Sequence, residues 1–189
     1  MVDIYGTHFA VLAAAVARTT GPILELGSGD FSTVMLHYMA GSRLLITADT
    51  DSAWLDKFAP GYACPGAHEF QHVKPVGDDA TPLVTRLIEG WRQWGTIESI
   101  GKWGLAFADC APGEARHELA IRLANRAHFV VCHDSEKDYA SGGNYMFDRL
   151  IPHFQHITEF RRWRPYTLIC SNVEPFGIEK CDQTWSPPA

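Results

Sequence analysis

The sequence predicts an α/β domain built on a doubly wound, mostly parallel sheet of seven strands that ends in a C-terminal antiparallel hairpin. The chain has 189 residues, which is the size of one domain. Hydrophobic residues make up 46% and charged residues 20%, a composition typical of a folded core. Short apolar runs alternate with segments of helical periodicity, the pattern of repeated strand–helix units.

The first half of the chain is expected to form one helix followed by three strand–helix pairs. The N-terminal helix falls within residues 1–20, and no basic residue precedes its apolar run, so a signal peptide is not expected. The helix after the second strand has Asp51 as its expected N-cap, and Pro82 suits the first turn of the third. The strands are 22–26, 43–48 and 69–73, the helices 33–40, 52–58 and 81–94, and the loop 61–67.

The second half continues the alternation and then changes character. Strands are expected at 103–108 and 127–132, and helices at 114–126 and 145–151, the latter ending near Pro152. Apolar runs at 154–160 and 166–170 are close enough to form the hairpin. Residues 1–189 therefore form a single domain, with a core at 21–171 and an irregular, Pro- and Gly-containing tail at 172–189.

Charge and cysteine content narrow the function classes. With 16 Lys and Arg against 22 Asp and Glu, the net charge of −6 argues against nucleic acid as a partner. Residues 161–164 form the one basic cluster in this acidic chain, and they are either a solvated turn or a clamp for phosphate. The sequence contains no run of 18 apolar residues, so no membrane-spanning helix is expected. The five cysteines form no CxxC pair, which indicates buried thiols and a cytoplasmic location.

Ligands of such sheets bind beyond the carboxyl ends of the strands, so the residues there are candidate site residues. Gly27, Ser28 and Gly29 follow the first strand, and Ser32 replaces the third glycine of the dinucleotide fingerprint. Asp49 follows the second strand, 22 positions after Gly27, where a carboxylate can accept both ribose hydroxyls. The alternative interpretation is an ordinary strand-to-helix turn with a solvated carboxylate.

Four segments in register resemble the class I S-adenosylmethionine-dependent methyltransferases, closest to the small-molecule O-methyltransferase-like group. They are 25–29 (Glu-Leu-Gly-Ser-Gly), 47–55 (Thr-Ala-Asp-Thr-Asp-Ser-Ala-Trp-Leu), 107–113 (Phe-Ala-Asp-Cys-Ala-Pro-Gly) and 130–134 (Val-Val-Cys-His-Asp). The resemblance implies a Rossmann-like fold, S-adenosyl-L-methionine as cofactor and transfer of a methyl group.

The resemblance also implies roles for residues at the strand ends. Gly27 and Gly29 would cradle the methionine end of the cofactor, and Glu25 would support that turn or the amino group. Asp49 would hold the ribose, and Asp109 would face the methionine part or the reacting centre. The remaining residues expected to bind the cofactor are Ser28, Ser32, Thr50 and, flanking the adenine, Asp78 and Asp79.

Three residues after the fourth and fifth strands are candidates for catalysis: Asp109, His133 and Asp134. In one hypothesis Asp109 and Asp134 bind a divalent cation, such as Mg²⁺, that lowers the pKa of an acceptor hydroxyl. The metal-dependent members of the resembled group carry Asp-Asn where this chain has Asp134-Ser135, so one ligand is replaced. In the second hypothesis His133 is the general base and Asp134 orients it. The third is a buried, satisfied histidine beside a helix-capping aspartate.

The function expected from these features is methyl transfer from S-adenosylmethionine to a small-molecule acceptor, a hydroxyl. The alternatives are an NAD- or nucleotide-dependent Rossmann-fold enzyme, a cofactor-binding module without catalysis, and methylation of RNA. Little of the chain remains outside the sheet to build an acceptor pocket. Either the acceptor is small, or the pocket is open, or a second copy of the chain completes it in a homodimer.

Overall fold

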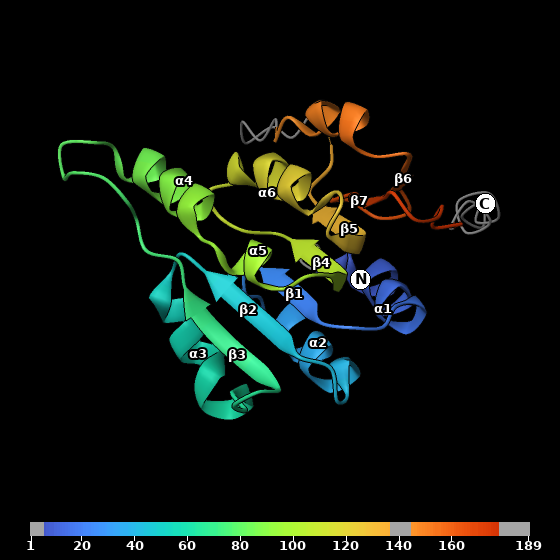
Figure 1. Ribbon diagram of the computed structural model, residues 1–189, viewed down its shortest axis with the longest axis horizontal. Coiled ribbons are helices and arrows are strands. Elements are labelled where there is room, and N and C mark those ends of the chain that lie inside the picture. Colours follow the sequence, from blue (N-terminus) through green and yellow to red (C-terminus); the bar gives the residue numbers. More distant parts are fainter. Residues whose placement is uncertain (1–5, 137–144, 178–189) are drawn as a thin grey trace, which may run out of the picture.

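The computed structural model describes residues 6–136 and 145–177, and these form one seven-stranded sheet (Figure 1). The strand order is β3-β2-β1-β4-β5-β7-β6, and β7 runs antiparallel to both of its neighbours. The predicted parallel sheet with a C-terminal hairpin is therefore confirmed. The strands are β1 (Ile23–Leu26), β2 (Leu45–Asp49), β3 (His68–His72), β4 (Trp103–Ala108), β5 (Ala127–His133), β6 (His156–Phe160) and β7 (Thr167–Ser171).

Burial follows position in the sheet. Every residue of β1, β2 and β4 is buried, because helices cover both faces of the central parallel strands. The edge strands β3 and β6 are only partly buried. This explains why the central strands are mostly apolar while the edge strands carry several His, Glu and Gln residues.

Helices on the two faces of the sheet build two separate cores (Figure 1). On one face α1 and α2 pack through Leu12 and Leu36, and on the other α4, α5 and α6 pack through Trp91, Ile97 and Leu119. The helices are α1 (Phe9–Arg18), α2 (Ser32–Ala40), α3 (Ser52–Tyr62), α4 (Leu83–Gln93), α5 (Thr96–Ser99), α6 (Ala115–Leu123) and the 3₁₀ helix η2 (Phe147–His153).

Two predictions of local structure were wrong, and one short helix was not predicted. The loop at 61–67 begins later, because α3 continues through Pro60 to Tyr62; the proline removes a single N–H near the helix end, and Ala63 N–H still bonds the Ala59 carbonyl. The α-helix at 145–151 is instead the 3₁₀ helix η2, a seven-residue segment with Pro152 inside it. The single turn of α5 was not predicted.

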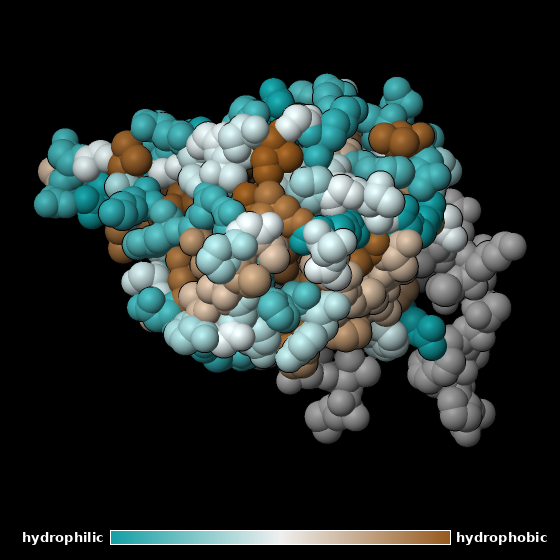
Figure 2. Space-filling view, turned by 60° about the horizontal axis from the view of Figure 1, so that its bottom comes forward, coloured by the Kyte–Doolittle hydropathy of each residue, from teal (hydrophilic) through white to brown (hydrophobic). Residues whose placement is uncertain are grey.

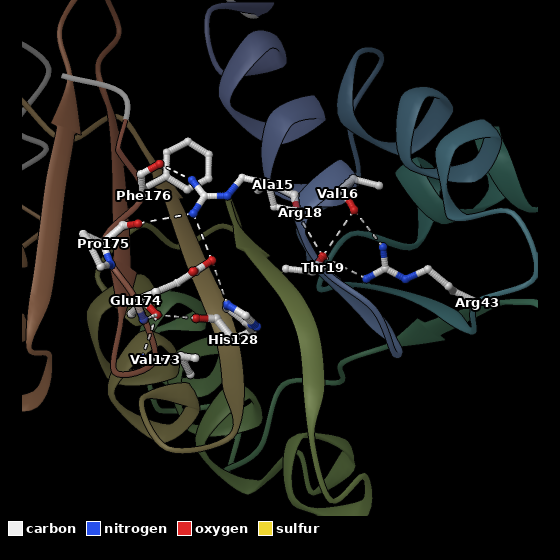
Figure 3. Close-up of polar contacts among 11 residues, drawn as sticks. Ala15, Val16, Arg18, Thr19, Arg43, His128, Val173, Glu174, Pro175 and Phe176 are labelled. Atoms are coloured by element: carbon white, nitrogen blue, oxygen red, sulfur yellow. Dashed lines mark hydrogen bonds and ion pairs between the residues drawn. The ribbon is translucent and has the colours of Figure 1, made fainter. Parts of the chain in front are cut away.

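At the amino ends of the parallel strands, Arg18 at the end of α1 forms hydrogen bonds with the segment that follows β7 (Figure 3). Its guanidinium donates to the carbonyl oxygens of Phe176 and Pro175 and pairs with Glu174, which also contacts His128 of β5. The first residues of the predicted tail are thus anchored to the core, whereas 178–189 lie outside the described residues.

Two further expectations concern compartment. Cys110, Cys132 and Cys170 are buried free thiols, as predicted, while Cys64 is exposed. Within residues 6–136 and 145–177, no helix combines the length and the apolar character needed to cross a bilayer. The cytoplasmic location remains a prediction.

Candidate cofactor and reaction site

The turn after β1 packs directly on the end of β4. Gly27 has a φ of +95°, which is the region that favours glycine. A Cβ atom at Gly27 would lie 2.6 Å from the carbonyl oxygen of Asp109. Any side chain here would therefore collide with the backbone that carries Asp109, so the turn and the strand-four acid are held in contact.

Asp49, at the end of β2, lies against the same turn. Its Oδ2 atom accepts hydrogen bonds from the backbone N–H and the hydroxyl of Ser28, both at 2.7 Å. Its Oδ1 atom accepts from the N–H of Asp51 at 2.9 Å, and Asp51 in turn caps α3, as predicted, by accepting from Ala53 N–H. The carboxylate expected to hold a ribose is thus placed beside the glycine turn.

Glu25 lies beneath the turn and is completely buried. It accepts hydrogen bonds from the hydroxyls of Thr33, at 3.0 Å, and Thr47, at 2.7 Å. Thr33 Oγ1 also accepts from the N–H of Gly29, so Glu25 supports the turn through Thr33. Burial raises the pKa of Glu25 to about 7, although hydrogen bonds from Ser32, Thr47 and Thr33 act in the opposite direction.

The other residues expected around the cofactor have local partners. The Thr50 hydroxyl donates to the Ala111 carbonyl at 2.9 Å, which ties the end of β2 to the loop after β4. Asp78 and Asp79 lie in the exposed arm between β3 and α4, which projects from the body of the molecule (Figures 1 and 2). Asp78 caps its own turn and Asp79 pairs with Arg86. Their contact with adenine remains a prediction.

Arg116, in the first turn of α6, joins the two strand-end aspartates. Its Nη2 atom lies 2.9 Å from Asp109 Oδ1 and its Nη1 atom 2.8 Å from Asp134 Oδ2. Its Nε–H donates to the Cys110 carbonyl at 2.9 Å, and the side chain is only 8% exposed. Sequence reasoning missed Arg116. The available signal was an arginine in the first turn of the helix that connects two strands, each directly followed by an aspartate.

This arrangement keeps Asp109 ionised. Burial by itself would raise the pKa of Asp109, but the positive charge of Arg116 and the hydrogen bond from His133 outweigh it and lower the pKa to about 2. The Asp109 side chain is still 25% exposed. Asp134 takes a φ of 60°, a left-handed conformation uncommon for a non-glycine residue, and this turns its carboxylate toward Arg116.

Both ring nitrogens of His133 are engaged. Thr7 uses its hydroxyl hydrogen on the Pro165 carbonyl, so its oxygen accepts from His133 Nε2 at 3.0 Å. His133 Nδ1 lies 3.3 Å from Asp109 Oδ2 and 3.4 Å from Asp134 Oδ1, which favours a proton on it. Although burial lowers the pKa of His133, the two aspartates outweigh it and raise that pKa. A general base needs a free nitrogen, so His133 instead positions Asp109, and Asp134 pairs with Arg116 rather than capping a helix.

His8, directly before α1, completes the cluster and was not expected there. It is 2% exposed, and its ring centroid lies 4.6 Å from that of His133 and 4.8 Å from that of Phe107. Within the described residues neither of its ring nitrogens has a hydrogen-bond partner. Burial lowers the pKa of His8 to about 4, and the nearby His133 acts in the same direction. His8 is therefore a neutral imidazole with unused polar atoms.

The structure gives no support to a cation held by Asp109 and Asp134, because the guanidinium of Arg116 already pairs with both carboxylates. Among the residues that the structure describes, one group has donor atoms within 4.8 Å of one another, namely His8, Asp109 and His133. In this group the protonated Nδ1 of His133 already satisfies Asp109. The guanidinium of Arg116 thus lies between Asp109 and Asp134, where a divalent cation was predicted.

No family model matches the sequence, and no curated protein matches it. Solved structures do match. Human methyltransferase-like protein 13 in complex with SAH has a TM-score of 0.59 and 14% identity over 97% of this chain and 86% of that chain. Spermidine synthase from Thermotoga maritima has a TM-score of 0.55 and 13% identity over 95% and 65%. The METTL16 MTase domain has a TM-score of 0.52 and 14% identity over 92% and 69%.

The fold of this chain is therefore the Rossmann-like fold of class I S-adenosylmethionine-dependent methyltransferases. At these identities the similarity defines the fold alone. What the chain binds and transfers has to be argued from its own side chains.

Proposed function

We propose that this chain is an S-adenosylmethionine-dependent methyltransferase that acts on a small-molecule acceptor. The observation that carries the proposal is the convergence of three strand ends on one turn. Gly27 packs on the backbone of Asp109, and Ser28 holds the carboxylate of Asp49. The fold, shared with a methyltransferase in complex with SAH, supports the same conclusion.

The side chains present fit this cofactor. Asp49 can exchange its two bonds from Ser28 for the ribose hydroxyls. The unpartnered ring nitrogens of His8, in the same cluster as Asp109, can receive the polar end of the methionine part. When bound, S-adenosylmethionine supplies a methyl group on a positively charged sulfur.

Asp109 is the group that meets the acceptor. Because its pKa is lowered to about 2, it is a weak base, and it accepts a hydrogen bond from the nucleophile instead of removing its proton outright. Arg116 and His133 fix both of its oxygens, so the orientation of the acceptor is set before the reaction. His133 and Arg116 are thus positioning residues.

Two finer predictions belong to this proposal. The hydroxyl as acceptor group was expected from the resemblance alone. Completion of the pocket by a second copy of the chain is a prediction that the molecular mass in solution checks. The rival functions are an NAD- or nucleotide-dependent enzyme, a module that binds cofactor without catalysis, and methylation of RNA.

Calorimetric titration with S-adenosylhomocysteine and with NAD separates the first rival. We expect S-adenosylhomocysteine to bind and NAD not to bind. Asp49→Asn should weaken binding of S-adenosylhomocysteine about 10- to 100-fold, because hydrogen bonds to a charged group contribute about 1.5–3 kcal/mol. Asp56→Asn, an exposed carboxylate on α3, is the matched control and should bind like wild type.

Formation of S-adenosylhomocysteine from S-adenosylmethionine in the presence of an acceptor pool separates the second rival. A methyltransferase turns over, and Asp109→Asn should reduce turnover more than cofactor affinity. If the protein binds NAD but not S-adenosylhomocysteine, the proposal is wrong. If it binds S-adenosylhomocysteine but turns over no acceptor pool, the non-catalytic module is favoured.

A further inference from the structure

A cavity of about 410 Å³ opens beside the charged cluster, between the end of β5, η2 and the β6–β7 hairpin. Ser135 and Glu136, the residues directly after Asp134, form part of its lining. This volume lies within the range of pockets that bind small organic molecules. We refer to it as the Glu136 pocket.

Tyr145 connects the Glu136 pocket to the reaction centre. Its ring forms one wall of the pocket, and the guanidinium of Arg116 lies 4.5 Å from the ring centroid. The ring occupies the space that a Cβ atom at Gly113 would need, at a distance of 2.0 Å. Since Arg116 binds Asp109 and Asp134 on its other side, a molecule in the pocket lies one side chain away from the acceptor position.

The polar part of the lining is acidic. Among the described residues, the lining contains three carboxylates, those of Glu136, Asp148 and Glu159, and no Lys, Arg or His. Glu159 is partly neutralised, because it accepts from the Ser135 hydroxyl at 2.7 Å and pairs with Arg161. Arg149, next to Asp148, is directed toward α6, where its Nη1 atom lies 3.5 Å from His117 Nε2.

Of the three carboxylates, Glu136 is the buried one that lacks a partner for one of its oxygens among the described residues. It is 5% exposed, and in the described part of the chain its buried Oε2 atom has no hydrogen-bond partner. Burial of an unpaired carboxylate is costly, and native structures pair nearly all such groups. The described part of the lining therefore offers Glu136 no positively charged partner.

An organic cation suits this pocket better than a metal ion. Among the described residues the three carboxylates form no group with donor atoms within 4.8 Å of one another, so a single ion does not bridge them. The other walls are apolar or aromatic, formed by Phe147, Ile151 and Ile157 together with Tyr145. Aromatic faces attract ammonium groups, and the aliphatic walls suit a hydrocarbon body.

We infer that the Glu136 pocket binds the acceptor of the proposed methyl transfer, and that this acceptor is a small molecule with an apolar body and an ammonium group. Glu136 holds the ammonium group as an anchor, and the methyl group passes from the sulfur to a second, neutral nucleophile of the same molecule that lies at Asp109. The inference rests on the proposed function for its meaning in catalysis. The binding claim itself can be tested with or without cofactor.

The test is a titration with two pairs of probes of equal shape, phenethylamine against 2-phenylethanol and benzylamine against benzyl alcohol. Wild-type protein, with and without S-adenosylhomocysteine, should bind each amine at least about tenfold more tightly than its alcohol, since one ion pair in a desolvated site is worth that factor. Glu136→Gln should abolish the preference while affinity for the alcohol is unchanged. Asp148→Asn, at an exposed position, should reduce it by a smaller factor.

Folding of Glu136→Gln is checked by thermal unfolding. We expect its Tm without ligand to be at or above that of wild type, because a buried unpaired charge is removed. Asp56→Asn is the control and should keep the preference for amines. Equal affinity for amine and alcohol, no binding of either amine in the millimolar range, or a preference that survives in Glu136→Gln would each overturn the inference. Failure of S-adenosylhomocysteine to bind would instead overturn the proposed function.

Discussion

Arg116 is the residue whose removal tests the electrostatic account of the site most directly. Arg116→Met keeps most of the apolar side-chain length and removes the guanidinium that pairs with Asp109 and Asp134. Two carboxylates that are 25% and 15% exposed then lose their cation. We expect the free energy of unfolding at pH 7 to fall by about 3–5 kcal/mol, the cost of breaking a buried ion pair from one side.

The pH dependence of this loss follows from Asp109. In wild type the pKa is lowered from 3.8 to about 2, which corresponds to about 2 kcal/mol of stability that is present above pH 4 and lost as the pH falls toward 2. Arg116 is the largest of the causes that lower the pKa of Asp109, so this stabilisation is reduced in the variant. The deficit of the variant should therefore be largest at pH 7 and should shrink as the pH falls from 4 toward 2.

Urea unfolding followed by tryptophan fluorescence measures both effects. The matched control is Arg92→Met, because Arg92 also binds a carboxylate through two nitrogens, both 2.7 Å from Glu118, but is 50% exposed. Its loss should cost no more than about 1 kcal/mol. Equal destabilisation by the two substitutions, or a deficit of Arg116→Met that does not change between pH 7 and 3, would refute the reasoning.

Three further outcomes are expected. Glu25→Gln should become more stable relative to wild type as the pH rises from about 5 to 8, by an amount on the order of 3 kcal/mol. The reason is that burial raises the pKa of Glu25 from 4.5 to about 7, so that ionisation destabilises the wild-type fold. Urea titrations at several pH values check this. EDTA should leave binding of S-adenosylhomocysteine and turnover unchanged, since Arg116 takes the place of a cation between Asp109 and Asp134. Arg18→Met should lower the free energy of unfolding by about 1 kcal/mol through its lost hydrogen bonds. It should not affect cofactor affinity, because Arg18 lies near the amino end of β5, whereas the candidate site lies at the carboxyl ends of the strands.

The sheet was predictable because its signal is local and strong. The runs at 22–26, 43–48 and 103–108 are mostly apolar, and strands with these sequences are buried on both faces. Short segments near proline were not predictable in the same way. The helix α3 passes through Pro60, and the segment around Pro152 forms a 3₁₀ helix, since contacts from outside the segment decide such cases.

The candidate site was predictable in part. Gly27, Asp49 and Asp109 stand at fixed points after strands, so their convergence follows from the topology of a parallel sheet. Thr7 and His8 come from a segment with no motif, and they reach the site only because α1 packs on the sheet. No spacing in the sequence relates residue 8 to residue 133.

The sequence by itself determined the fold class, the sheet and the row of acids at the strand ends, because periodicity and chain order are sufficient for these. The tertiary structure decided the state of those acids. Arg116 turns a predicted metal site into an ion-pair cluster, and His133 supports Asp109. Within the described residues, the buried Oε2 atom of Glu136 has no hydrogen-bond partner. Charge state depends on burial and on which groups meet in space, and residues far apart in the chain set both.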